Sequence, residues 1–490
     1  MRNQRNRVLA KRIVNEATRR GYTLTRKALT LLESSEDPIK TLEKAINLLT
    51  NHGAGSRIID EKVLREVSEV EVEPEPVEEL VEEIPEPPIE IDERFLKEYR
   101  ITGSFEEFQK YFRSRYEKLA SALRERLGGV VDLRTALRLR EGQEAYVVAM
   151  LSDRRESEKA WMLRVDDPSA EARIIVPKTS EAGEAAEKSL MDSVLGIRVV
   201  KRGNSLIARE IVFPDVAQEE TKKLDLAANV CMISDIHVGS KKFRDDLFES
   251  FLDWINRARD PEVKRIKFLV VAGDLVDGVG VYPHQQEELE LTSIKDQLKM
   301  LSKLLAEVPE RIKIIVAPGN HDPVQKPLPQ PPLSGEYRKI LEQSGRRMIF
   351  VGNPAWISLG GRRILVYHGQ GLDDVLQLVP GFSHSALREN IGRALELLLK
   401  HRHLAPIYGE NTPVLPLNED LLVIDKTPDI IHVGHVHVAY AGSYRGIRLL
   451  NTGTWQEQTS FQRNIGLEPT VGVAAVVNLG DLSIRVKKFM

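Results

Sequence analysis

Potential metal ligands follow five short apolar runs in the second half of the chain. In chain order they are Asp235 and His237 after ANVCMIS, Asp274 after IKFLVVAG, Asn320 and His321 after IKIIVAPG, His368 after RILVY, and His435 and His437 after DIIHVG. A single Asp-x-His or Gly-Asn-His is common in turns, but here each one ends a strand-like run. Because open α/β sheets place their sites beyond the carboxyl ends of strands, the five segments indicate one shared site.

The donor atoms of this set suit two divalent cations. Apart from His321, the set holds two carboxylates, one neutral amide oxygen and four imidazoles. One ion would not use seven mixed ligands, whereas two ions that share a carboxylate would. Paired ions about 3.5–4 Å apart clamp a phosphoryl group and lower the pKa of a water between them. The resulting hydroxide attacks phosphorus in line, so the predicted chemistry is phosphoester hydrolysis.

Two residues of the third segment are candidates for proton transfer. His321 can bind the phosphate or protonate the leaving oxygen, and we expect Asp322 to orient its imidazole. A further histidine, His432, lies on the opposite side of its strand from the neighbouring odd positions, so we interpret it as structural.

The elements that position these residues are predicted to form an α/β sandwich over residues 221–490. Helical segments separate several of the five apolar runs, as in folds where helices cover β-sheets. Cys231, within the first run, is expected to be a small buried hydrophobe.

Residues 95–220 are predicted to form a leading helix and a small barrel. A helical pattern covers about 95–127, and five β-type runs separated by polar turns follow the glycines at 128–129. A helical interruption near 180–192 suits a Greek-key barrel of the OB type. Trp161 and Tyr146 would stack on bases if the barrel binds single strands. The alternatives are core or partner-facing aromatics, and a barrel that docks another protein.

The N-terminal part is predicted to be a small helical domain, residues 1–65, followed by a disordered linker, residues 66–94. Helices are expected in RVLAKRIVNEATRR and after Thr25, Asp37 and Asp60. Residues 1–50 carry 11 Lys and Arg against 5 Asp and Glu, so a basic face could contact nucleic acid or simply be solvated. Residues 69–93 hold 12 acidic residues and five prolines, a composition typical of an extended tether.

The composition excludes several classes of protein. The chain has 490 residues, 42% of them apolar, which is enough for two to four folded domains. One cysteine excludes a disulfide framework and a multi-cysteine metal site within the chain. No apolar stretch approaches the roughly 18 residues of a membrane span, so we expect no membrane partner and an intracellular protein. The net charge of −3 does not argue against DNA, because 12 of the 73 acidic residues lie in the tether and bound cations would offset the charges of Asp235 and Asp274.

The five segments resemble the calcineurin-like metallophosphoesterase superfamily, whose motifs stand here as SDIHVG, GDLVDG, GNHD, YHG and GHVH. By that resemblance one cation takes Asp235, His237 and His437, and the other takes Asn320, His368 and His435. The resemblance also implies that Asp274 bridges the two cations, that His321 is catalytic, and that Asp277 is a structural or supporting acid. The implied architecture is a multidomain α/β protein with a small N-terminal helical domain, an OB-type β-barrel and a four-layer α/β sandwich.

Sequence between these motifs is similar to a narrower family, the small subunits of archaeal family-D DNA polymerases. The matching segments are GVGVYPHQQEEL (278–289), RHLAPIYG (402–409), LVIDKTPDIIHVGHVH (422–437) and NTGTWQEQTSFQ (451–462). The resemblance implies a 3′→5′ proofreading exonuclease that acts on the primer 3′ end and forms a heterodimer with a large polymerising subunit. It implies Mn²⁺ as the cation, with Zn²⁺, Fe²⁺ or Mg²⁺ as alternatives. It also implies that the barrel and the sandwich together dock the large subunit, and that the protein is cytoplasmic and nucleoid-associated.

Two other classes of function stay open at this point. One is another enzyme of the superfamily, a repair nuclease or a phosphatase. The other is a catalytically inactive accessory subunit, in which ligand positions would be lost. The complete ligand set favours an enzyme, and the barrel and tethered helices favour the polymerase-associated one.

Overall fold

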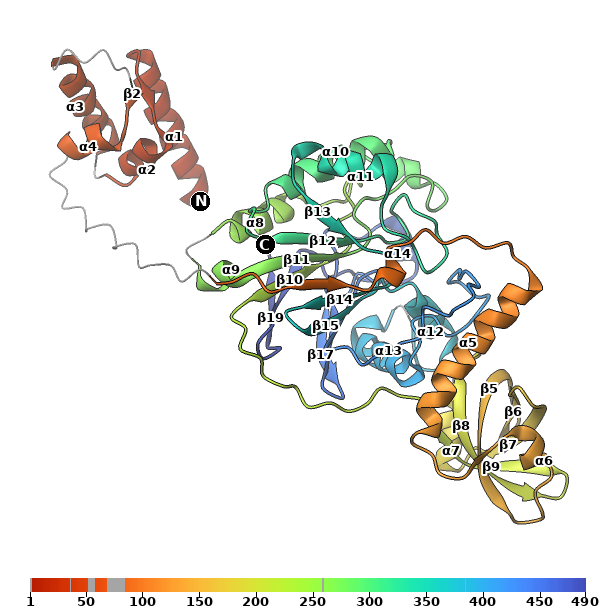
Figure 1. Ribbon diagram of the computed structural model, residues 1–490. Helices are drawn as coiled ribbons and strands as arrows, with labels where there is room; N and C mark the ends of the chain where they lie inside the picture. Colours follow the sequence, from red (N-terminus) through yellow and green to blue (C-terminus); the bar gives the residue numbers. More distant parts are fainter. Residues whose placement is uncertain (1, 36, 52–57, 68–83, 258–259, 384) are drawn as a thin grey trace. The chain divides into compact units, whose positions relative to one another are not determined.

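A computed structural model describes residues 2–35, 37–51, 58–67, 84–257, 260–383 and 385–490 (Figure 1). The chain divides into two compact units, Met1–Glu83 and Ile84–Met490. The larger unit holds a β-barrel and a two-sheet domain, so the fold is multidomain and mixes helices with sheets, as the sequence predicts.

The N-terminal unit is helical. Its elements are α1 (Arg2–Arg19), β1 (Thr23–Leu24), α2 (Arg26–Glu33), α3 (Pro38–Asn51), β2 (Ile58–Ile59) and α4 (Glu61–Val67). The Thr25 hydroxyl accepts a hydrogen bond from the Ala28 amide and caps α2, and Pro38 opens α3, where its missing N–H costs nothing. The four expected helices are confirmed, and they enclose a small apolar core that includes Ile13, Leu32 and Leu42.

The first part of the larger unit is a closed five-stranded barrel. Its elements are α5 (Phe105–Arg124), β4 (Val130–Val131), α6 (Leu133–Leu137), β5 (Glu144–Glu156), β6 (Ala160–Asp166), β7 (Glu171–Pro177), α7 (Glu181–Lys188), β8 (Val194–Arg202) and β9 (Ser205–Val212). The strand order is β4-β5-β6-β7-β9-β8, in which pairing of β5 with β8 closes five strands into the barrel and the two-residue β4 is added to β5. The five expected strands and the helix between the third and fourth are confirmed. Trp161 lies under the cations of Arg154 and Lys178, and the Tyr146 hydroxyl donates to Glu210.

The rest of the chain forms two six-stranded sheets. The first has the order β13 (Met348–Phe350), β12 (Lys313–Ala317), β11 (Ile266–Ala272), β10 (Asn229–Ile233), β19 (Val473–Asn478), β20 (Ile484–Lys488). The second has the order β17 (Tyr440–Tyr444), β18 (Ile447–Asn451), β16 (Ile430–Val433), β15 (Arg362–Val366), β14 (Ala355–Leu359), β3 (Ile89–Ile91).

Helices cover the outer face of each sheet, which gives four layers (Figure 1). On the first sheet lie α8 (Asp245–Ile255), α9 (Pro261–Arg265), α10 (Ile294–Ala306) and α11 (Gly335–Leu341), and on the second lie α12 (Gly371–Leu378) and α13 (Leu387–His401). Strand β10 has apolar side chains on both faces, so both faces must be covered. Val230 and Met232 point into the core between the sheets, and Cys231 and Ile233 point toward the helices. Cys231 is fully buried and free, as expected.

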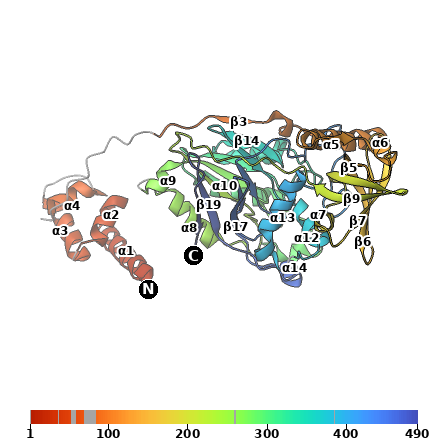
Figure 2. The same ribbon diagram turned by 90° about the horizontal axis from the view of Figure 1, so that it is seen from below.

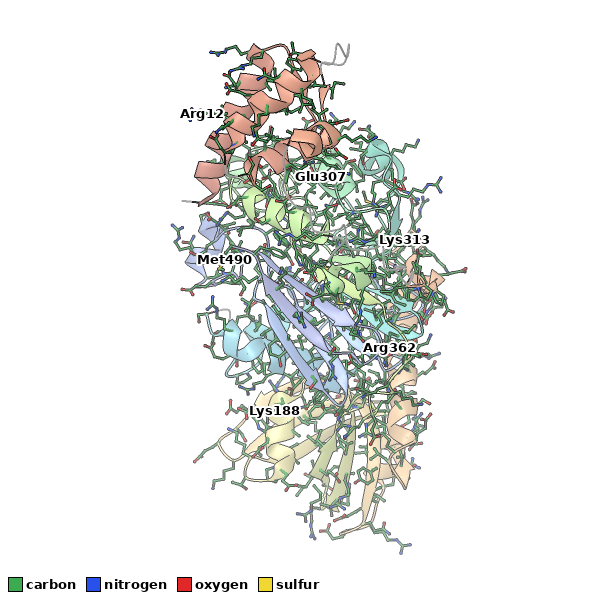
Figure 3. The ribbon with its side chains drawn as sticks, turned by 90° about the vertical axis from the view of Figure 1, so that its left-hand side faces the viewer. Arg12, Lys188, Glu307, Lys313, Arg362 and Met490 are labelled. Carbon is green, nitrogen blue, oxygen red and sulfur yellow. The ribbon has the colours of Figure 1, made fainter. Side chains whose placement is uncertain are left out.

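Arg362, labelled in Figure 3, connects the two sheets. It begins β15 in the second sheet, and its buried guanidinium donates to the carbonyl oxygens of Leu479 and Gly480, which follow β19 of the first sheet. A buried cation needs such acceptors, so this residue ties the ends of the sheets together.

The prediction of a disordered linker over residues 66–94 is wrong for the last part of that range. Residues 68–83 lie outside the described residues, but β3 is an edge strand of the second sheet, antiparallel to β14 (Figure 2). Pro87 and Pro88 stand just before the strand, where a missing N–H costs no ladder hydrogen bond. Phe95, just after it, is buried in the main core. Residues Ile89–Ile91 therefore form a strand despite the neighbouring prolines.

Helix α5 fixes the barrel to the two-sheet domain (Figure 2). Its Arg115 is buried and donates to Asp420 at 2.8 Å and to the Pro406 carbonyl at 2.6 Å. His403 lies 2.9 Å from the same carboxylate. The buried charge is paired and hydrogen-bonded, as such groups must be.

In the described part of the chain, no helix is long and apolar enough to cross a membrane.

Candidate metal centre

All five predicted ligand segments meet at one edge of the two sheets. The segments follow β10, β11 and β12 of the first sheet and β15 and β16 of the second, and each begins within a few residues of its strand's end. Five ligand residues have left-handed backbone conformations that side chains rarely adopt: Asp235 (φ 52°), His237 (φ 55°), Asp274 (φ 49°), His435 (φ 68°) and His437 (φ 57°). Such residues cost free energy and cluster at functional sites, where the surrounding structure holds them in place.

Two glycines let the segments approach one another. A Cβ at Gly319 would lie 2.2 Å from Asp274 Oδ1, and a Cβ at Gly434 would lie 2.3 Å from Asp235 Oδ2. Neither carboxylate can withdraw without leaving the site, so both positions require glycine.

The side chains of Asp235, His237 and His437 come together as a group that could hold a metal ion, and we call these candidate ligands the first ligand group. Nε2 of His437 lies 3.0 Å from Nε2 of His237 and 3.4 Å from Oδ1 of Asp235. Donor atoms at such separations fit a cation about 2.0–2.2 Å from each of them. All three side chains are buried.

The second ligand group combines Asn320, His368 and His435. Oδ1 of Asn320 lies 3.0 Å from Nε2 of His368 and 3.0 Å from Nδ1 of His435. Asp274 lies between the groups, with Oδ2 3.7 Å from Nε2 of His237 in the first and 3.2 Å from Nε2 of His368 in the second. The donor set therefore fits two cations that share the Asp274 carboxylate.

Each histidine ligand has a partner for its other ring nitrogen. Nδ1–H of His368 donates to the Ala272 carbonyl at 2.8 Å, and Nδ1 of His237 lies 3.0 Å from Oδ1 of Asp277. The remaining two pairs are Nε2 of His435 with Oδ2 of Asp373 (2.8 Å) and Nδ1 of His437, which accepts from the side-chain N–H of Gln462 (2.8 Å). Such partners orient the rings of metal-binding histidines.

His321 lies beside the centre rather than in either group. Its Nδ1–H donates to the Asp277 carbonyl at 2.6 Å, and its Nε2 lies 4.0 Å from Oδ2 of Asp274. Burial lowers the pKa of His321, against the opposing effect of Asp274. The free Nε2 is the atom that could reach a phosphate.

Asp322 does not orient His321 in this structure, contrary to the sequence expectation. Its buried carboxylate accepts hydrogen bonds from the backbone amides of Leu275, Val276 and Gly319. The Asp322 side chain points away from His321 because it accepts from amides of two segments, the one after β11 and the turn after β12. The Asp277 carbonyl orients the His321 ring instead. Burial and the Asp274 charge raise the pKa of Asp322 to about 7.

Opposite charges in the cation-free site shift the pKa values of the ligands. Burial alone would lower the pKa of His368, but the Asp274 carboxylate outweighs it and raises the pKa to about 10. Burial would raise the pKa of Asp274, but His368 and His321 hold it well below its usual range. Without cations, protons on the histidines therefore balance part of the negative charge that bound cations would neutralise.

The centre opens into a cavity of about 390 Å³. One part of its lining is polar and includes Asp373, Gln377 and Asn411, and another part is apolar. The apolar lining residues are Val281, Tyr282, Phe461, Ile465 and Leu467. The ligands His237, Asp274, Asn320, His435 and His437 also line the cavity.

Sequence reasoning missed several residues of this site. Asp373 stands on the surface of α12, where an acid in the first turn is unremarkable, and Gln462 is a helix-capping residue of α14 (Ser460–Asn464). Tyr282 and Phe461 lie inside the segments 278–289 and 451–462, so the similarity of those segments to a known family was the available signal. His432 is buried against the Thr452 hydroxyl, consistent with a structural role.

Comparison with known proteins places these features in context. Residues 230–441 match a family model that describes the B subunits of DNA polymerases alpha and epsilon. A DNA polymerase II small subunit of Halobacterium salinarum is 33% identical over 98% of this chain and 98% of its own length.

A DNA polymerase II small subunit of Pyrococcus furiosus is 40% identical over 77% of this chain, and the match spans 63% of that relative, less than two thirds of its length. Among solved structures, one described as a novel archaeal phosphodiesterase matches 53% of this chain and 98% of its own, with 12% identity and a TM-score of 0.26.

Proposed function

Because the chain belongs to the family of DNA polymerase II small subunits, we propose that it supplies a two-metal 3′→5′ exonuclease that proofreads the primer end. In this proposal it hydrolyses DNA phosphodiesters and forms a heterodimer with a large polymerising subunit, docked by an OB-type barrel and the two-sheet domain. The observation that carries the proposal is the pair of ligand groups that share Asp274 in one cavity.

Seven side chains of the chain would hold the two cations. The first cation takes Asp235, His237, Asp274 and His437, and the second takes Asp274, Asn320, His368 and His435. Mixed imidazole and oxygen ligands suit Mn²⁺, our expectation, and also Zn²⁺ or Fe²⁺, while Mg²⁺ would favour more oxygen. When bound, two such cations neutralise a phosphoryl group and lower the pKa of a water.

The role proposed for His321 follows from its fixed orientation. The Asp277 carbonyl holds the proton at Nδ1, so Nε2 is available to a phosphate oxygen or to the leaving oxygen. The negative charge of a bound phosphate would oppose the effect of burial and raise the His321 pKa. The protonated ring could then donate its Nε2 proton to the leaving oxygen.

A gel assay tests the proposal. With Mn²⁺, the chain alone or with its large subunit should shorten a 5′-labelled mismatched primer one nucleotide at a time. His321→Ala should slow this reaction by about 10²- to 10⁴-fold, the usual contribution of a general acid. Full-rate digestion by a folded His321→Ala protein would refute the assigned role.

Purification from the native source separates this proposal from its alternatives. A large polymerising subunit that copurifies, together with nuclease activity, supports it. Copurification without any phosphodiester cleavage would instead favour an inactive accessory subunit. Cleavage with no large subunit would favour a repair nuclease or a phosphatase.

A further inference from the structure

Two aromatic side chains form part of the cavity wall and take no part in cation ligation. Tyr282 lies in the loop after Asp277, and Phe461 is on α14. Their ring centroids are 6.4 Å apart and their planes differ by 30°. Phe461 is 56% exposed. A single exposed phenylalanine is ordinary, but this one faces a cavity that also contains the metal centre.

One carboxylate holds the segments of both aromatic residues in place. The Tyr282 hydroxyl donates to Oε2 of Glu288 at 3.0 Å, and the Ser460 hydroxyl donates to Oε1 of the same residue. A capping box between Thr459 and Gln462 closes the start of α14. The Gln462 amide in turn contacts His437. The Tyr282 side chain and the helix start that carries Phe461 are therefore tied to one another and to the candidate ligand His437.

Ring contacts through His321 connect the aromatic pair to the metal centre. Tyr282 is 6.3 Å from His321 between ring centroids, and His321 is 4.7 Å from His237. In a nucleotide, the base is separated from its phosphate by one sugar. A phosphate near His321 would therefore leave its base within reach of Tyr282 and Phe461. The apolar side chains Ile465 and Leu467 line the same cavity.

We propose that Tyr282 and Phe461 form a stacking platform for the base of the 3′-terminal nucleotide of a single strand. This inference rests on the proposed exonuclease function and adds how the substrate is recognised. Stacking on aromatic rings tolerates every base, as an exonuclease requires. A base paired within a duplex is already stacked, whereas a mismatched terminal base costs less to move onto the platform. The platform thus favours unpaired ends.

An abasic substrate isolates the contribution of the base. Loss of one aromatic stacking partner costs about 1–3 kcal/mol, so Phe461→Ala should lower kcat/KM for an ordinary 3′-terminal nucleotide by about 5- to 150-fold. With a tetrahydrofuran abasic residue at the 3′ end, Phe461→Ala and wild type should differ little. Phe461→Trp should retain activity, and Phe461→Leu should resemble Phe461→Ala. Equal losses on both substrates would overturn the platform.

A binding measurement needs no chemistry. A single strand ending in 2-aminopurine should lose fluorescence on binding to the full chain in EDTA, because stacking quenches this base. Phe461→Ala should reduce the quenching, and Phe105→Ala should not, since Phe105 is 72% exposed at the start of α5 and does not line the cavity. Equal quenching by wild type and Phe461→Ala would overturn the proposal. Quenching that depends on Phe461 without Mn²⁺-dependent digestion would overturn the exonuclease and leave the platform standing.

Discussion

The two ligand groups of the metal centre are held in different ways. In the first group, Asp277 supports His237 from a position that is 1% exposed, and Gln462 supports His437 from another buried one. In the second, His435 is 15% exposed and its partner Asp373 is 36% exposed. His368, also in the second group, is fully buried and bonded to a backbone carbonyl.

This difference indicates that the two groups of one site bind their cations with different affinity. Groups that are locked in the interior keep their geometry without a ligand, whereas partly exposed ones exchange with water and solutes. We infer that the first group holds its cation more tightly and that the second is the exchangeable one. Asp274 is shared by the two groups, so its removal should weaken the binding of both cations. Removal of a residue that supports one histidine should weaken the binding of only one cation.

Replacing Asp274 should have the largest effect. Asp274→Ala removes an oxygen ligand from both groups, so activity should fall by more than the roughly 100-fold that supporting residues cost at most. Inductively coupled plasma mass spectrometry should find both cations depleted. Asp296→Ala, on the exposed face of α10, is the matched control. Loss of only one cation would mean that Asp274 does not bridge.

Replacing Asp277 should weaken the first group alone. Its carboxylate faces His237 and also accepts hydrogen bonds from Gln285 and Gln456, so Asp277→Asn removes the charge and leaves donors unpaired. Affinity for the first cation should fall by about 10- to 100-fold. Isothermal titration should show one of two Mn²⁺ binding steps weakened, and excess Mn²⁺ should restore activity. Weakening of both steps to the same extent would argue against separate groups.

Cation binding to the second group should strengthen as the pH rises. In the cation-free chain, Asp274 raises the pKa of His368 to about 10, so a proton occupies Nε2 at neutral pH and competes with the cation. The affinity should rise by about tenfold per pH unit between pH 7 and 9, as expected for release of one proton. Calorimetry in buffers of different ionisation enthalpy measures this release. A pH-independent affinity would show that His368 carries no proton to lose.

Replacing Asp373 should have the smallest effect. Asp373→Asn changes the partner of His435, but that partner is partly exposed and water can substitute for it. Affinity for the second cation should fall by about tenfold or less, against the larger loss for Asp277→Asn. The same titration compares the two variants directly. A larger loss for Asp373→Asn would reverse the inferred order of the groups.

The sequence was sufficient to predict which side chains the fold brings together at one site, because each candidate ligand closely follows its strand. Asp235, Asp274 and His368 stand within two residues of the end of an apolar strand, and the barrel strands and N-terminal helices were equally local signals. The wrong predictions concern features that depend on contacts between distant segments. Strand β3 pairs with β14 across more than 260 residues, and the prolines before it suggested a linker instead.

The supporting residues illustrate the same limit. Asp322 is adjacent to His321 in sequence, yet its carboxylate satisfies backbone amides, and the carbonyl of Asp277 takes the expected role. Asp373 reaches His435 from a helix surface 62 residues away. No local pattern distinguishes such an acid from a solvated one.

The central claim is that two cations share Asp274, and electron paramagnetic resonance of the Mn²⁺-loaded chain tests it most directly. Two equivalents of Mn²⁺ should give the spectrum of an exchange-coupled pair, because a single carboxylate bridges ions about 3.5–4 Å apart. Asp274→Ala should abolish that coupling. A wild-type spectrum of isolated Mn²⁺ ions, or saturation at one ion per chain, would contradict the two-metal account.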